Sequence, residues 1–337
     1  MKNWQEGSFR MKVYHLWFSI IFLELVSCGQ KAGYDLSELS SPIIFKGDSL
    51  TAYRDPAVLY HEGSIYMYFT LVEIEADGSV FSYTTYSKSD NLIDWEEPIK
   101  ITSRDQNLNY CSPGNVIRYG DEWILCLQTY PRPGHNISEP TRYGNQDARV
   151  FIMRSSDLVE WSTPELLKVK GNEVPKEEMG RMIDPYLLQD KDDPDKWWCF
   201  YKQNGASMSY SYDLKDWTYF GRTEAGENVT VLVQEDSYWM IHSPKNGIGI
   251  KKSEDLKHWE DWGSIITLGQ KDWDWAKGRL TAATVVDLRQ VKGIQKYLMF
   301  FHGSGPLTEE EGDFDRNASI GIAWSDDLVN WNWPIMR

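Results

Sequence analysis

The chain has 337 residues, with 35 Lys and Arg against 50 Asp and Glu, so its formal net charge is −15. A nucleic-acid partner is therefore not expected, because such proteins carry a basic surface; neutral or cationic ligands agree better with this charge. The 16 Trp and 19 Tyr residues suit packing between structural elements and stacking on flat ligand faces, and packing is the expected role of most of them.

Residues 1–28 have the pattern of an export signal. Met11-Lys12 precedes an apolar run, residues 13–26, which ends at Ser27-Cys28-Gly29. A charged start, a short apolar region and small residues at the cut are typical of a secretory signal, and a cysteine at the cut resembles a bacterial lipobox, in which Cys28 would be lipidated. We expect an exported protein held by this lipid on the outer membrane of a bacterium, at its periplasmic or cell-surface face. A plain signal peptide or a short anchor is the alternative, since Glu24 interrupts the apolar run.

Residues 29–41 are polar and are predicted to form a tether, so the fold is predicted to span residues 42–337. Three cysteines lie in this part of the chain: Cys111, Cys126 and Cys199. An odd number allows at most one disulfide within a monomer, and all three lie in or beside strand-like runs. We therefore expect buried thiols.

A short motif occurs five times and divides the chain into similar units. Each copy has an acidic turn, a leucine, two mostly polar residues and a tryptophan; the copies are residues 89–95, 156–161, 212–217, 254–259 and 326–331. A unit of roughly 40 to 70 residues with about four strands is typical of a propeller blade. The sequence therefore predicts an all-β fold, a five-bladed β-propeller with four-stranded antiparallel blades. The motif itself is expected to be scaffold, because an aspartate in such a turn bonds its own backbone while the leucine and tryptophan pack.

Three acidic residues stand at the predicted starts of inner strands. These are Asp55, Asp184 and Glu227, in blades one, three and four. The inner strands of a propeller surround a central funnel, so the starts converge on one axis. Convergent carboxylates repel one another, an arrangement that suits acid–base chemistry. Hydrolysis of a glycosidic bond needs such a set, with one carboxylate to handle water or the sugar carbon and one acid to protonate the departing oxygen.

Each acid also has a structural interpretation. An Asp before Pro at a strand start is a common turn device, which applies to Asp55 and Asp184 taken singly. Glu227 could be a solvated loop residue. The functional interpretation rests on two Asp-Pro pairs at equivalent positions of separate blades.

These features together resemble glycoside hydrolase family 43 and its five-bladed relatives, in a clan that includes families 32, 62, 68 and 117. The resemblance rests on the five blades, Asp55-Pro56 in blade one, Asp184-Pro185 in blade three and Glu227 opening blade four, and it covers the chain from about Pro42 onward. It implies that Asp55 is the general base that activates water, that Asp184 tunes and orients the acid, and that Glu227 is the general acid. The implied outcome is inversion at the sugar carbon.

The chain departs from the family pattern in two blades. Residues 111–115 read Cys-Ser-Pro-Gly-Asn where family members often have Trp-Ala-Pro-Asp or Glu, and residues 227–229 read Glu-Asn-Val where they often have Glu-Gly-Pro. These departures keep open a catalytically silent propeller that binds glycans or a protein partner. Arg54-Asp55-Pro56 is also similar to fructan- and sucrose-cleaving relatives, so a retaining fructosidase is a further alternative, as is an anhydrogalactosidase.

Polar side chains near the inner and second strand ends are expected to bind sugar hydroxyls: Tyr53, Arg54, Asn115, Arg181, Lys202, His242, Arg279 and His302. Trp273 and Trp275, in a loop leading into blade five, are candidates for stacking on a sugar ring, with packing as the alternative. The six histidines are scattered singly, so no zinc-type spacing is present and neither a metal nor another cofactor is expected in catalysis. His302 matches the place where family members have a histidine near the channel, sometimes beside a cation, so a structural calcium ion there is compatible with the resemblance.

The expected activity is exo-acting and inverting removal of a terminal sugar from plant or algal oligo- or polysaccharides by a monomer. Arabinofuranosidase-, xylosidase- and galactosidase-like specificities all remain open, because loop geometry decides the sugar and the linkage.

Overall fold

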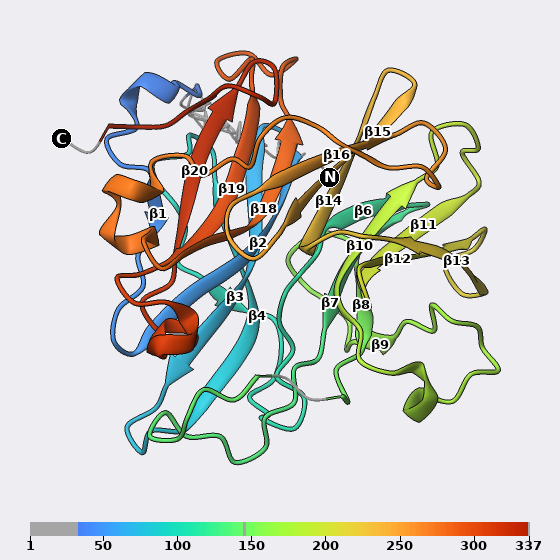
Figure 1. Cartoon of the computed structure of the whole chain (residues 1–337), viewed down its shortest axis with the longest axis horizontal. Helices are drawn as coiled ribbons and strands as arrows, with labels where there is room; N and C mark the ends of the chain where they lie inside the picture. The colour runs from blue at the N-terminus through green and yellow to red at the C-terminus, as the bar shows by residue number, and fades with distance from the viewer. Residues whose placement is uncertain (1–32, 144–145, 336–337) are drawn as a thin grey trace, which may run out of the picture. The chain divides into compact units, whose positions relative to one another are not determined.

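The predicted five-bladed propeller is confirmed. The computed structural model describes residues 33–143 and 146–335, and in these residues the strands form five antiparallel sheets arranged around a common centre (Figure 1). The first strands of neighbouring sheets, β2, β6, β10, β14 and β18, contact one another in a closed ring. Each sheet is one blade, and in blades one to four the strands follow one another outward in chain order.

The blades have the following strands. Blade one has β2 (Thr51–His61), β3 (Ser64–Ile74), β4 (Val80–Ser89) and β5 (Ile99–Lys100). Blade two has β6 (Val116–Tyr119), β7 (Glu122–Gln128), β8 (Val150–Ser155) and β9 (Glu165–Leu166). Blade three has β10 (Ile183–Gln189), β11 (Trp197–Lys202), β12 (Ala206–Ser211) and β13 (Trp217–Thr223). Blade four has β14 (Glu227–Gln234), β15 (Ser237–Ser243), β16 (Gly249–Ser253) and β17 (Glu260–Asp261). Blade five has β18 (Arg279–Asp287), β19 (Tyr297–Ser304), β20 (Ser319–Ser325) and β21 (Trp331–Asn332).

Helical structure in the described residues is limited to short turns. They are η1 (Leu36–Glu38), η2 (Lys176–Met179), η3 (Gln270–Asp272), η4 (Asp274–Ala276) and η5 (Glu309–Asp313). No helix in residues 33–143 and 146–335 has the length and apolar character needed to cross a membrane.

Blade five combines strands from both ends of the described chain. Strand β1 (Ile43–Phe45) pairs with β20, with Ile43 opposite Gly321, and β21 pairs with another part of β20. The first strand of the fold thus joins the last blade to the first, which closes the ring through backbone hydrogen bonds. The sequence prediction placed only C-terminal strands in this blade.

The part of the predicted tether that is described packs against the propeller. Tyr34 is buried in the core between blades five and one, and its hydroxyl donates a hydrogen bond to the Gly63 carbonyl at 3.1 Å. The chain is therefore held to the fold from Tyr34 onward. The predicted signal and the candidate lipidation site Cys28 lie outside the described residues.

The hydrophobic core lies between neighbouring blades. One cluster contains Ile124 of β7 and Trp197 of β11, which join blades two and three, and similar clusters join the other blades. Cys111, Cys126 and Cys199 are buried and free, as predicted. Burial raises the pKa of the Cys111 and Cys126 thiols to about 12.

The repeated motif is a tight turn between the third and fourth strands of a blade. In blade two, Leu158 has a left-handed φ of 67° and is 1% exposed, and its N–H donates to the Ser155 hydroxyl at 2.9 Å. Oδ1 of Asp157 accepts the N–H groups of Val159 and Glu160, both at 2.9 Å, and these bonds lower the pKa of Asp157. Nε1 of Trp161 donates to the Leu158 carbonyl. The prediction that the motif bonds its own backbone is confirmed.

Candidate active site

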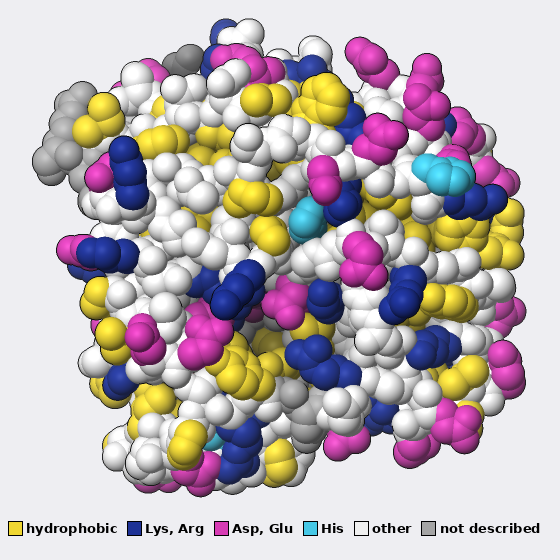
Figure 2. All heavy atoms as spheres, in the orientation of Figure 1, with side chains coloured by type: hydrophobic (Ala, Val, Ile, Leu, Met, Phe, Trp, Pro, Cys, Tyr) yellow, Lys and Arg dark blue, Asp and Glu magenta, His cyan; other side chains and the backbone are white. Residues whose placement is uncertain are grey.

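A pocket of about 440 Å³ is formed where the inner strands converge. The three acids predicted from the sequence, Asp55, Asp184 and Glu227, all line it, from β2, β10 and β14. Figure 2 shows the hollow near the middle of this face, with acidic side chains in it and several Lys and Arg side chains around it. Blades one, three and four therefore bring residues far apart in the chain into one cavity.

The backbone has the same bend near the start of every inner strand. The residue at this bend has a left-handed φ between 42° and 53° in each blade; these residues are Asp55, Ser112, Asp184, Asn228 and Ala282. In blades one, three, four and five the pairing of the first two strands shifts register at this point. Such bulges redirect side chains next to functional sites, and Asp and Asn tolerate a left-handed φ better than most residues.

Glu227 stands one residue before this bend. Its position therefore corresponds to Arg54 of blade one and not to Asp55, whose counterpart in blade four is Asn228. Asn228 has a φ of 49°, a conformation that glycine adopts freely. This agrees with the family pattern Glu-Gly-Pro, in which a glycine follows the glutamate.

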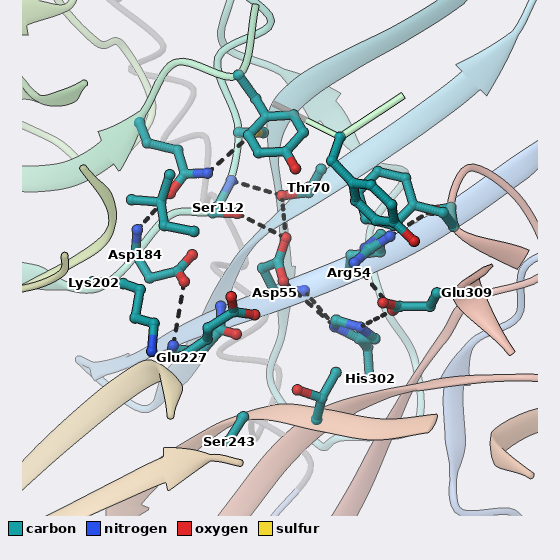
Figure 3. Close-up of a pocket in the computed structure, with 18 of the residues that line it drawn as sticks. Arg54, Asp55, Thr70, Ser112, Asp184, Lys202, Glu227, Ser243, His302 and Glu309 are labelled. Carbon is teal, nitrogen blue, oxygen red and sulfur yellow. Dashed lines mark hydrogen bonds and ion pairs between the residues drawn. The ribbon is translucent and has the colours of Figure 1, made fainter. Parts of the chain in front are cut away.

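Asp55 is held by neighbours on three sides. Its Oδ2 accepts hydrogen bonds from the hydroxyls of Thr70 at 3.0 Å and Ser112 at 2.9 Å (Figure 3). The Ser112 N–H donates to the Thr70 hydroxyl oxygen at 2.7 Å, which leaves the Thr70 proton for Asp55. The backbone N–H of Asp55 donates to Nδ1 of His302 at 3.1 Å. The carboxylate is thus fixed in one orientation at the bottom of the pocket.

His302 connects Asp55 to a buried glutamate that the sequence analysis did not identify. Because Nδ1 accepts a hydrogen bond, the ring proton belongs on Nε2, which lies 3.5 Å from Oε1 of Glu309. Burial lowers the pKa of His302, so the imidazole is neutral. Glu309 lies in η5, an insertion between β19 and β20, and no motif in the sequence distinguishes it from Glu310 and Glu311.

Glu309 is an ionised carboxylate held between two arginines. It is 2% exposed, and its oxygens lie 3.1 Å from Nη2 of Arg54 and 2.5 Å from Nη1 of Arg279. Burial by itself would raise the pKa of Glu309, but Arg54, His302 and Arg279 together hold it well below its usual range. Arg54 and Arg279 share this carboxylate, and Arg279 also lies 3.4 Å from Glu227, so each of these charges has an opposite charge at contact range.

Asp184 and Glu227 form a second electrostatic unit. Asp184 is 7% exposed; its N–H donates to Oε1 of Gln128 at 2.5 Å and its Oδ2 accepts the N–H of Asn228 at 3.4 Å. Burial, the carboxylate of Glu227 and that of Asp55 raise the pKa of Asp184 to about 8. Glu227 is more open to solvent and lies 3.4 Å from Nη2 of Arg279. The raised pKa favours the protonated form of Asp184 in the folded protein.

Two insertions form the wall of the pocket beside blades one and two. Arg132 is 1% exposed and its Nη1 lies 2.7 and 2.9 Å from the two carboxylate oxygens of Asp315, which also lies 3.2 Å from Nε2 of His135. The guanidinium of Arg54 lies 4.2 Å from the centre of the Phe314 ring. The insertion after β7 and the insertion before β20 are thus joined by a buried ion pair and by aromatic contacts.

The structure divides the predicted sugar-binding residues into two groups. Arg54, Arg181, Lys202, Arg279 and His302 line the pocket. The remaining candidates, Tyr53, Asn115, His242, Trp273 and Trp275, are not among its lining residues.

Asn115 and His242 have structural contacts instead of facing the pocket. Nδ2 of Asn115 donates to the Leu187 carbonyl at 2.7 Å, and Oδ1 of Asn115 accepts the Leu187 N–H at 2.9 Å. These two bonds join blade two to blade three. Nδ1 of His242 accepts the N–H of Gly226 at 3.0 Å, and burial lowers the pKa of His242 to about 4. Strand ends alone did not reveal which side of the strand each residue occupies.

The expectation that Trp273 and Trp275 stack on a sugar is corrected. The two rings stack on each other with centroids 5.1 Å apart, and both stack on Phe301 of β19. Trp273 is 5% exposed and belongs to the core between blades four and five. Their apolar area is already used for packing, so they are not available to a ligand in the pocket.

The described residues contain no group of three or more His, Cys, Asp or Glu placed to hold a metal ion. Both ring nitrogens of His302 already have partners, the Asp55 N–H and Glu309. His302 therefore offers no free ligand atom for a channel cation, and calcium, which takes six to eight oxygens, does not fit this histidine.

Comparison with known proteins gives similarity in structure only. No protein-family model and no curated protein matches the chain. A thermostable family-43 glycoside hydrolase is similar with a TM-score of 0.58 and 15% identity, over 88% of this chain and 97% of the other. An exo-1,5-α-L-arabinanase from a bovine ruminal metagenomic library is similar with a TM-score of 0.56 and 13% identity, over 90% and 99%.

The catalytic domain of a GH62 α-L-arabinofuranosidase from Coprinopsis cinerea is similar with a TM-score of 0.58 and 10% identity, over 83% of this chain and 96% of the other. At these identities the likeness concerns the fold. The chain is therefore similar, over most of its length, to the five-bladed β-propellers of family-43 and GH62 glycoside hydrolases.

Proposed function

We propose that this protein is a glycoside hydrolase that removes a terminal sugar from plant or algal oligo- or polysaccharides with inversion of the anomeric carbon. The observation that carries the proposal is the placement of Asp55, Asp184 and Glu227 in one pocket with different surroundings. Asp55 is oriented by two hydroxyl donors, whereas burial and the carboxylates of Glu227 and Asp55 raise the pKa of Asp184. Inverting glycosidases need such a division between a base and an acid.

Asp55 would act as the general base. Its Oδ2 is bound to Thr70 and Ser112, so Oδ1 is the oxygen available to a water molecule. The carboxylate takes a proton from this water as the water oxygen bonds to the anomeric carbon.

Glu227 would protonate the departing oxygen, and Asp184 would tune and orient it. The raised pKa of Asp184 supports this role, because it keeps Asp184 protonated near neutral pH. After the bond breaks, Glu227 has lost one proton to the leaving sugar and Asp55 has gained one from water, so charge balances over the turnover.

The shape of the pocket supports exo action. The wall formed by the Arg132–Asp315 pair and Phe314 closes one side of the cavity. A pocket with a closed side accommodates the end of a glycan better than its middle. The structural likeness to an exo-arabinanase also supports cleavage at the end of a glycan chain.

A screen of aryl glycosides with plant and algal oligosaccharides tests the proposal, with proton NMR of the first anomer released. We expect one glycan class to be cleaved with inversion, and Asp55→Asn to lower kcat by roughly 10²–10⁴-fold. Asp236→Asn, in the exposed β14–β15 turn, is the matched control. Binding without turnover by the unmodified protein would identify a silent glycan-binding propeller, and unchanged turnover in Asp55→Asn would exclude the assigned base.

The export prediction is likewise a proposal, supported by residues 11–28. Metabolic labelling with a radioactive fatty acid should label the protein, and Cys28→Ser should abolish the label and release the protein from membranes. Label that persists in Cys28→Ser would exclude this residue as the attachment point.

A further inference from the structure

Six basic side chains line the pocket of a chain whose net charge is −15. Arg54, Arg132 and Arg279 are paired with Glu309, Asp315 and Glu227. The other three are Arg181, Lys202 and Lys245, and none of them has a carboxylate within ion-pair distance in the described residues. Three of the six basic side chains in the pocket therefore have no carboxylate partner at ion-pair distance among the described residues.

These three residues come from blades three and four, the blades that also contribute Asp184 and Glu227 to the pocket. Lys202 ends β11, and its Nζ donates to the carbonyl of Ala225 at 3.1 Å, two residues before Glu227. Lys245 lies two residues after Ser243, which pairs with Glu227 across β14 and β15. Figure 3 shows Lys202 on the same side of the pocket as Asp184 and Glu227, with Arg54 and Glu309 on the other side.

Arg181 completes this side of the pocket. It precedes β10, whose first residue Ile183 pairs with Lys202, and its backbone carbonyl accepts Nε2 of Gln203 at 2.9 Å. Its charge acts on Asp184 through space and opposes the rise in the pKa of that carboxyl. The exposed acid Glu310, which also lines the pocket, belongs to η5 with Glu309, and so to the other side.

The two sides of the pocket therefore differ in charge. Among the described residues, the buried charges around Asp55 have partners, whereas Arg181, Lys202 and Lys245 line the cavity without a carboxylate at ion-pair distance. Cations that converge on a cleft raise the local concentration of anionic ligands, even on a protein of negative net charge. A bound anion would supply the negative charge that these three cations lack in the protein.

We propose that the substrate carries an anionic group, a uronate carboxylate or a sulfate ester, on the sugar that leaves. The inference rests on the proposed function, because Glu227 is there the group that protonates the departing oxygen. Side chains around Glu227 then contact the leaving-group sugar. Lys202, Lys245 and Arg181 bind its carboxylate or sulfate by charge-assisted hydrogen bonds, and they thereby select acidic glycans over neutral ones.

The first test uses matched substrate pairs for the full protein. One pair is an oligosaccharide with a uronate on the leaving side and the same compound with its carboxyl reduced to an alcohol. The other is a sulfated algal oligosaccharide and its desulfated form. We expect kcat/KM to be roughly tenfold or more higher for the acidic member of one pair, and the pair that shows this identifies the anion. Equal values in both pairs, with turnover present, would overturn the inference and leave the proposed function intact.

The second test uses variants of the basic residues. Lys245→Met, which removes an exposed side chain with no hydrogen bond to the described protein, should raise KM for the acidic substrate roughly tenfold while kcat changes much less. Lys202→Met together with Lys245→Met should lower the acidic-to-neutral preference further. Lys292→Met, exposed in the β18–β19 connection at the end of the blade away from the pocket, is the control and should change neither constant. A preference retained in the double variant would overturn the inference.

A binding measurement covers the case in which no glycan is cleaved. Calorimetry with trigalacturonate, galactotriose and a sulfated galactan trisaccharide should show binding of one of the two acidic trisaccharides only, weakened by salt and by Lys245→Met. That result without turnover would refute the proposed hydrolase and retain the anionic glycan site. Absence of binding by both acidic sugars would refute the site.

Discussion

The backbone N–H of Asp55 donates to Nδ1 of His302 at 3.1 Å, and this bond places the imidazole proton on Nε2, toward Glu309. The proposed base is thereby connected to a buried cluster of Glu309, Arg54 and Arg279. The same Arg279 lies 3.4 Å from Glu227, so the cluster touches both the base and the acid. The orientation of the proposed base and of the proposed acid thus depends on residues of blades one and five.

Replacing Glu309 by Gln should destabilise the protein strongly. The change leaves the buried Arg54 without its charge partner, and breaking a buried pair costs about 3–5 kcal/mol. The free energy of unfolding in urea measures this loss. Glu310→Gln is the matched control, because Glu310 is an exposed neighbour in the same turn and should stay within about 0.5 kcal/mol of the original protein. Equal stabilities of the two variants would show that the pair contributes nothing.

Replacing Glu227 by Gln should affect substrates according to their leaving group. Natural glycosides need a proton on the departing oxygen, so kcat should fall roughly 10²–10⁴-fold. In an aryl glycoside of a strongly acidic phenol, the phenolate leaves without that proton, so kcat for this substrate should fall much less. Steady-state kinetics on both substrates give the comparison. Equal losses on the two would assign the acid to another residue, and Asp184 would be the next to test.

The stability of Asp184→Asn should differ from that of the original protein in a pH-dependent way. The pKa of Asp184 is raised from 3.8 to about 8, so the folded state favours the protonated carboxyl. The stability linked to this group is fully present below pH 3.8 and is lost as pH rises to about 8. Asn does not ionise, so the variant should gain in Tm relative to the original protein across this window, and the gain should level off above it. A difference in Tm that is constant from pH 4 to 9 would contradict the raised pKa.

Replacing Ser112 by Ala should weaken catalysis without preventing folding. The change removes one of the two hydroxyl donors to Oδ2 of Asp55, which would let the carboxylate turn away from the attacking water. A hydrogen bond to a charged group supports a decrease in kcat of roughly tenfold, with KM little changed. Ser264→Ala, on an exposed loop, is the control. A decrease in Ser112→Ala that appears only in KM would assign the hydroxyl to substrate binding.

The number of blades could be predicted because the information is local and repeated. In each blade a serine or aspartate side chain bonds the backbone of its own turn, and a leucine such as Leu158 or Leu328 fills the core beside it. Such bonds depend on residues two or three positions apart, so they are visible in the sequence. The joining of β1 to β20 was not predicted, because no local pattern links Ile43 to Gly321.

The three acids could be located because the propeller places every inner-strand start at one centre. Asp55 and Asp184 occupy the same bulge position in their blades, while Glu227 stands one residue earlier. Sequence spacing does not distinguish these two positions. The bulge is a property of the pairing between the first and second strands.

The fold class, the blade boundaries and the three acids of the pocket can be predicted from the amino-acid sequence alone, since they follow from short-range turn chemistry and strand periodicity. Four findings depend on contacts between blades. Glu309 supports His302, Asn115 joins two blades, Trp273 is core, and Arg181, Lys202 and Lys245 line the pocket with no carboxylate partner among the described residues. The physical reason is that burial and charge compensation depend on which side chains from different blades and insertions meet, and these lie up to hundreds of residues apart in the chain.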